Sequence, residues 1–232
     1  MELTAQEQKC LDHLMVIPPD YTGAEQVIRD ENLSPESVSR IGYAYADECF
    51  CDAWPDANYP EDLFENGIIQ NRNSTNLYQV MEFLLRFGLD PNVCEDDMHL
   101  LVALRFVDNE YVAADTMALL LEHGADIASH TSGESIFQDI DFDVLFDAIN
   151  QEIRHRFDTV VHCWLVMLGY GGWKQLPEDC ITLFREFESN QLFSWEKLRN
   201  HRNYYVGLSM ENNKKTIRIY DKRTFWEVAK IV

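Results

Sequence analysis

A short pattern that occurs twice, 36 positions apart, constrains the fold of this chain more than any other feature. The first copy is FLLRFGLDPNV at residues 83–93, and the second is LLLEHGADIA at residues 119–128. Each has an apolar end, two spacer residues, a glycine, one further residue and an aspartate. The spacing predicts two helices that end alike and enter the same kind of turn.

The residue types of the pattern explain why a helix should end there. Gly88 and Gly124 stand where the helix must stop, and glycine adopts the left-handed conformation at little steric cost. Asp90 and Asp126 suit the turn because a short carboxylate accepts hydrogen bonds from nearby backbone amides. Pro91 then prevents the first helix from continuing. The alternative is that two unrelated helix ends agree by chance.

The apolar positions of the pattern fall on one helical face and predict a core. A unit of this size buries too little surface alone, so neighbouring units must stack to close a core. The predicted core residues are Met81, Leu84, Leu85, Met117, Leu120 and Leu121.

The repeated pattern resembles the second helix and turn of an ankyrin repeat, a family with a period near 33 residues. The resemblance covers about residues 60–172. A third, degraded copy places Leu165 and Gly169 where the first has Leu84 and Gly88. Residues 97–100 depart from the Thr-Pro-Leu-His that usually opens the family's first helix. The resemblance implies a mainly α fold, an ankyrin-like helical solenoid.

The sequence on either side of the repeats predicts two further segments. Residues 1–59 should form N-terminal helices, a cap or a degenerate repeat, with Thr4, Thr22 and Ser34 as helix N-caps. Residues 60–172 hold the repeats. Residues 173–232 should form a helix and a small three-stranded antiparallel β-meander, because apolar residues alternate over 204–210, 216–220 and 225–232.

Charge is distributed unevenly along the chain. The formal net charge is −21, with 15 acids and 3 bases in residues 1–70, 17 and 5 in residues 71–160, and 8 and 11 in residues 161–232. An acidic body argues against nucleic acid and anionic membranes as partners and favours a cationic protein. The alternative is that the acidic residues serve only to keep the protein soluble. A more specific hypothesis is that the basic tail binds nucleic acid, but the negative net charge of the chain argues against it.

No motif of a catalytic or cofactor site occurs, so we expect no enzyme activity, metal or cofactor. The acids at 139, 141 and 143 are interrupted by Ile140 and Phe142 and lack a calcium loop's glycine. Cys49 and Cys51 have no second pair to complete a zinc site. The absence of a signal segment, a membrane span or a cysteine framework predicts a reduced, cytoplasmic protein.

The resemblance implies that the chain binds a protein, because ankyrin proteins bind partners at their turn tips and first helices. By position, these are residues 90–97 and 126–134. An inhibitor or immunity-type protein that covers a basic enzyme is a narrower possibility. The alternatives are an enzyme whose site no motif reveals, and a pure scaffold. The candidate partner-binding residues are Glu95, Asp96, Asp97, Asp139, Asp141, Asp143 and Trp54.

Overall fold

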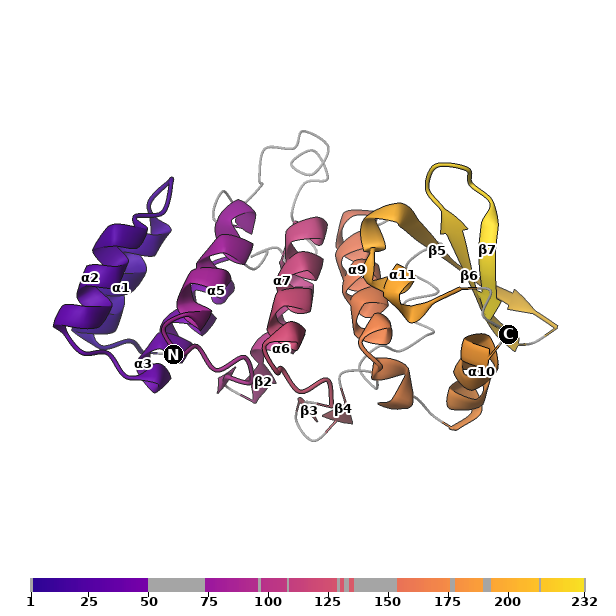
Figure 1. Ribbon diagram of the computed structural model, residues 1–232, viewed down its shortest axis with the longest axis horizontal. Helices are drawn as coiled ribbons and strands as arrows, with labels where there is room; N and C mark the ends of the chain where they lie inside the picture. Colours follow the sequence, from indigo (N-terminus) through magenta and orange to yellow (C-terminus); the bar gives the residue numbers. More distant parts are fainter. Residues whose placement is uncertain are drawn as a thin grey trace, which may run out of the picture. The chain divides into compact units, whose positions relative to one another are not determined.

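The computed structural model (Figure 1) is mainly helical, with a small antiparallel sheet near its C-terminus. It describes residues 2–49, 74–95, 97–107, 109–128, 130–131, 134–135, 154–175, 178–189, 193–212 and 214–231. The chain divides into two compact units, Met1–Asp126 and Ile127–Val232. The three segments expected from the sequence divide the chain differently and stay a prediction.

The first unit begins with α1 (Ala5–Met15), α2 (Tyr21–Asp30) and α3 (Pro35–Asp47). Thr4 caps α1 in a reciprocal capping box with Glu7, and Ser34 caps α3, as predicted. The predicted cap at Thr22 is wrong. Asp20 caps α2 instead, because its carboxylate accepts a hydrogen bond from the Gly23 amide at 2.9 Å and so begins the helix earlier.

The structure describes three further helices of the first unit after residue 73. They are α5 (Leu77–Leu85), which follows the 3-10 turn η1 (Ser74–Asn76), then the short α6 (Leu100–Ala103) with η2 (Leu104–Phe106), and α7 (Glu110–Glu122). The helix α5 packs against both α3 and α7, so these three helices share one apolar core. The start of the predicted repeat region, residues 60–73, lies outside the described residues.

The predicted core leucines divide into two classes. Leu84 and Leu120 are fully buried, as are Met81 and Met117, which confirms the predicted apolar face. Leu85 and Leu121 are only half-buried, so their placement in the core is wrong. Each lies one position later on its helix, which turns its side chain about 100° from that of the buried leucine before it.

Three helices of the first unit end in the same backbone geometry. Gly88 and Gly124 both have φ +95°, as predicted, and Asn32 has φ +49° at the end of α2. In each case the left-handed residue donates its N–H to the carbonyl three residues back. The following N–H reaches five residues back, to Ile28, Leu84 and Leu120 respectively. This is the Schellman arrangement, which satisfies carbonyls that the helix end leaves open.

Each of the two repeated turns leads into a two-stranded hairpin. The strands β1 (Cys94–Glu95) and β2 (Met98–His99) are antiparallel, and so are β3 (His130–Thr131) and β4 (Glu134–Ser135) in the second unit. Corresponding strands begin 36 residues apart, which is also the spacing of the two glycines. The same period therefore extends from the helix ends into the hairpins.

The described part of the second unit contains a long helix, two shorter ones and the sheet. The helices are α9 (Arg154–Gly169), α10 (Glu178–Ser189) and α11 (Trp195–Arg199), with 3-10 turns η3 (Gly172–Gln175) and η4 (His201–Asn203). The strands β5 (Tyr204–Glu211), β6 (Lys214–Asp221) and β7 (Glu227–Ile231) form an antiparallel sheet in the order β5-β6-β7. This is the predicted meander.

The third copy of the turn is shifted from its predicted position. Gly169 is the last residue of α9, whereas Gly171 has the left-handed φ of +93° and donates its N–H to the Leu168 carbonyl at 3.0 Å. The match of Gly169 to Gly88 is therefore wrong by two residues. Because the two glycines are only two positions apart, the sequence does not indicate which of them adopts the left-handed conformation.

Candidate functional site

Two of the predicted partner-binding acids lie in the hairpin between β1 and β2. Asp97 occupies the turn with φ +62°, a conformation that aspartate tolerates better than most residues, and its side chain is exposed. Glu95 is half-buried and pairs with Met98 across the hairpin. The helix that follows these acids, α6, begins at Leu100. The other five candidates, Trp54, Asp96, Asp139, Asp141 and Asp143, lie outside the described residues.

The two hairpin acids produce a local negative potential. Partial burial raises the pKa of the Cys94 thiol above its ordinary value, and the charges of Asp97 and Glu95 raise it further. A nearby negative charge disfavours the thiolate, which is why both carboxylates act in the same direction as burial. The hairpin thus presents an acidic, partly apolar tip.

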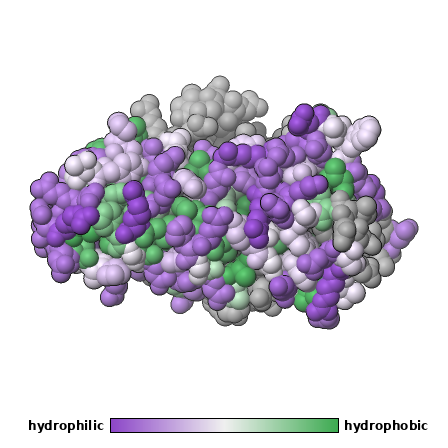
Figure 2. Space-filling view, viewed as in Figure 1, coloured by the Kyte–Doolittle hydropathy of each residue, from purple (hydrophilic) through white to green (hydrophobic). Residues whose placement is uncertain are grey.

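Almost all of the net charge belongs to the first unit. Met1–Asp126 contains 25 acidic and 6 basic residues, a formal charge of −19, whereas Ile127–Val232 contains 15 and 13, a charge of −2. On the face drawn in Figure 2, hydrophilic side chains lie over much of the surface, with hydrophobic residues between them. Any electrostatic attraction of a cationic partner therefore acts through the first unit.

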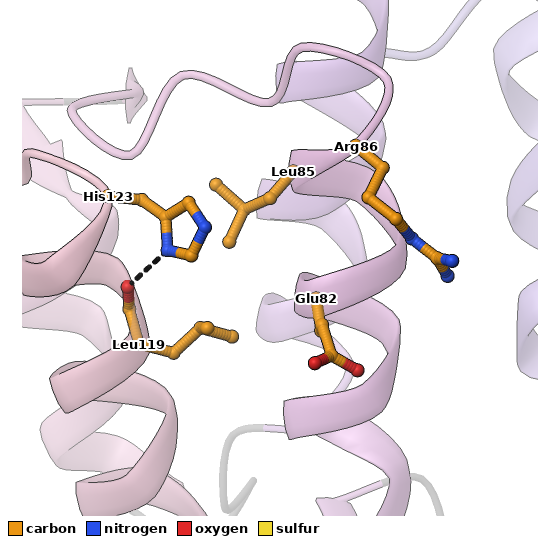
Figure 3. Close-up of a pocket in the computed structure, with 5 residues that line it drawn as sticks. All are labelled: Glu82, Leu85, Arg86, Leu119 and His123. Atoms are coloured by element: carbon orange, nitrogen blue, oxygen red, sulfur yellow. Dashed lines mark hydrogen bonds between the residues drawn. The ribbon is translucent and has the colours of Figure 1, made fainter.

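A groove of about 460 Å³ lies between α5 and α7 in the first unit (Figure 3). Its apolar walls are Leu85 from α5 and Leu119 from α7, and their side chains lie on facing sides of it. Glu82, one turn before Leu85, adds an exposed carboxylate. The groove exists because α5 and α7 pack side by side along their buried faces and leave their outer edges apart.

His123, the residue after α7, closes one end of the groove. Its Nδ1 lies 2.9 Å from the carbonyl oxygen of Leu119, so this nitrogen carries the hydrogen and donates it. In the neutral imidazole the other nitrogen, Nε2, is then an acceptor. In Figure 3 it lies on the side of the ring that faces Leu85. The groove therefore offers the carboxylate of Glu82 as an acceptor and, where the imidazole is neutral, Nε2 of His123 as a second one.

The surface around the groove is negative. Partial burial raises the pKa of Tyr78, which lies on α5, and the carboxylates of Glu82, Asp115 and Glu122 raise it further. Two of these acids belong to α7 and one to α5. An acidic field therefore spans both helices beside the groove.

Arg86 is the one cation that lines the groove among the described residues, and its side chain points away from it in Figure 3. Its guanidinium lies over the ring of Phe83, 5.5 Å from the centroid. Glu82 forms no ion pair with any described residue. The carboxylate of Glu82 is therefore not paired with the arginine four positions later in the sequence.

Other kinds of site were sought in the part of the chain that the structure describes. There, no group of three or more histidine, cysteine, aspartate or glutamate side chains is placed to hold a metal ion. Within the same residues, no helix has the length and apolar character needed to cross a membrane. Comparisons with protein-family models, with curated proteins and with solved structures gave no match.

The sequence analysis missed the groove completely. Leu85 was assigned to the core, and His123 was not among the candidate residues. No local pattern could have indicated the site, because Glu82 and His123 lie 41 positions apart and only the packing of α5 on α7 brings them together.

Proposed function

We propose that this chain is a protein-binding module of the ankyrin-repeat type whose acidic N-terminal unit binds a basic protein. The observation that carries the proposal is the concentration of charge, −19 over Met1–Asp126. A field of this sign raises the encounter rate with cationic surfaces and repels nucleic acid and anionic membranes.

The ankyrin-type architecture is supported by a period rather than by a match to a family. The left-handed glycines Gly88 and Gly124, their identical hydrogen bonds and the hairpins that follow all recur at 36 residues. Neighbouring repeats would stack in register and place their hairpin tips in a row. In such a row, the tip at Glu95 and Asp97 is a natural contact for a partner.

A narrower form of the proposal is an inhibitor or immunity-type protein of the cytoplasm that covers a basic enzyme. The acidic surface would then mimic the enzyme's anionic substrate. Such a protein needs no catalytic residues of its own.

Affinity capture tests the proposal. The tagged full chain is incubated with lysate of its source organism at 50 and 500 mM salt, and bound proteins are identified by mass spectrometry. We expect basic proteins to dominate at low salt and to be lost at high salt, because screening shortens the range of the acidic field severalfold over this interval. A bound set that is the same at both salts, or is not enriched in basic proteins, would contradict the proposal.

A matched pair of variants locates the contact. Glu95→Gln with Asp97→Asn removes two hairpin charges, and asparagine tolerates the left-handed turn at position 97. Asp12→Asn with Glu36→Gln removes two exposed charges elsewhere on the same unit. The hairpin pair should reduce capture of the basic proteins more than the control pair.

A further inference from the structure

We infer that the groove between α5 and α7 is a socket for a single arginine side chain, presented by a protein segment with apolar neighbours. This inference rests on the proposed function, which says only that the acidic unit binds a basic protein. It names a binding site and the chemical group that binds there, and this site is distinct from the hairpin tips.

The walls of the groove fit the stem of a long cationic side chain. Leu85 is half-buried and Leu119 is 6% exposed, so together they offer an apolar channel that still opens to solvent. Arginine places its methylene groups along apolar surface while its charged head stays in a polar setting. The volume of about 460 Å³ lies within the range of ligand pockets.

The acceptors of the groove fit a guanidinium better than an ammonium. Glu82 supplies a carboxylate from α5, and His123 supplies Nε2 from the far side of the groove. These acceptors come from two directions. A planar guanidinium carries five donors in a fixed fork that point in several directions, whereas lysine is a compact point charge.

The surroundings favour a cation over an anion. Glu82, Asp115 and Glu122 together raise the pKa of Tyr78, so a carboxylate or phosphate would meet repulsion from both helices. Arg86 does not pair with Glu82, and its guanidinium is directed over Phe83. The same carboxylates would attract an incoming arginine and strengthen its hydrogen bond to Glu82.

The test uses the full chain and a synthetic helical peptide of alanine and leucine with one central arginine. Its counterpart carries citrulline, which has the same shape without the charge. Binding is followed by NMR, with the methyl signals of Leu85 and Leu119 as reporters. We expect the arginine peptide to shift both signals and the citrulline peptide to bind about tenfold more weakly, since a charge-assisted hydrogen bond is lost.

Two pairs of variants separate the groove from the general charge. Glu82→Gln removes the groove carboxylate, and Glu36→Gln removes an exposed acid of α3. Leu85→Gln alters the groove wall, and Leu121→Gln alters the half-buried residue at the equivalent position of α7, outside the groove. The groove variants should each weaken binding of the arginine peptide about fivefold or more, and the controls less than twofold.

Three results would overturn the inference. One is binding of the peptide without a shift of the two leucine signals, and another is an equal effect of groove and control variants. The third is no binding of the arginine peptide at millimolar concentration. The proposed function fails by a different measurement, the salt dependence of capture, so the two can be judged separately.

Discussion

The side chain of Asn92 joins two successive turns by hydrogen bonds to the backbone around Asp126. Its Oδ1 accepts the Asp126 N–H at 2.6 Å, and its Nδ2 donates to the Gly124 carbonyl at 3.2 Å. One repeat earlier, the Asp90 N–H donates to Ser39 Oγ at 2.8 Å. In both turns, a side chain of the preceding element thus accepts the N–H two residues after the left-handed glycine.

Replacing Asn92 with alanine should lower the free energy of unfolding by about 1–2 kcal/mol, since two hydrogen bonds of ordinary net value are lost. A urea melt of both proteins measures the difference. If the midpoint and slope do not change, the contact between the turns does not contribute to stability.

The two adjacent leucines at the end of α7 should differ in their contribution to stability. Leu120 is fully buried and Leu121 is half-buried. Leu120→Ala should cost about 2–5 kcal/mol, because it opens a cavity that neighbours cannot fill, and Leu121→Ala should cost clearly less. Denaturant melts of the two variants provide the test. Equal losses would show that the assigned core face is incorrect.

The two left-handed glycines should also respond differently to alanine. Both have φ +95°, so each substitution strains the backbone by about 1 kcal/mol or more. At Gly88 the new Cβ would also lie 3.2 Å from Cβ of Pro35, whereas at Gly124 nothing lies within 4 Å. Gly88→Ala should therefore lower the melting temperature more than Gly124→Ala. The reverse order would contradict the contact between this turn and the start of α3.

Acid should destabilise the second unit through His162. This residue of α9 is 5% exposed, and burial lowers its pKa to about 3, with contributions from His201 and Lys222. The unfolded chain takes up this proton near pH 6.5, before the folded one does. Neutral His162 therefore makes its full contribution to the free energy of unfolding above pH 6.5, and this contribution is lost as the pH falls toward 3.

His162→Leu measures this effect, because it removes the titrating group and keeps the site apolar. Unfolding can be followed by fluorescence, since four of the five tryptophans belong to the second unit. Below pH 6.5, the stability of the variant should depend less on pH than that of the parent, by up to about 1.4 kcal/mol per unit. The same slope in both proteins would mean that other groups cause the acid sensitivity.

Much of the fold could be predicted because it is determined by local sequence. The capped starts at Thr4 and Ser34, the left-handed glycines and the alternating strands of the meander each depend on a few neighbouring residues. The hairpin of Cys94–His99 was not predicted. Its strands have two residues each, too few for alternation to be visible, and its acids are equally typical of a helix start.

The candidate site could be predicted only in part. Glu95 and Asp97 were proposed from charge and from their position at a repeat tip, and the structure describes them at a hairpin tip. The groove depends on which side of α5 meets α7. That choice turns on Leu84 being inside and Leu85 at the edge, a distinction of one helical position that tertiary packing decides.

The central claim is that the acidic first unit binds a basic protein, and the association rate constant of that complex tests it most directly. Stopped-flow mixing with the basic protein captured most strongly should show association that slows markedly from 50 to 500 mM salt. The Glu95→Gln, Asp97→Asn variant should associate more slowly than the parent at low salt. An association rate that neither salt nor this variant changes would contradict the account, and would assign the acids to solubility.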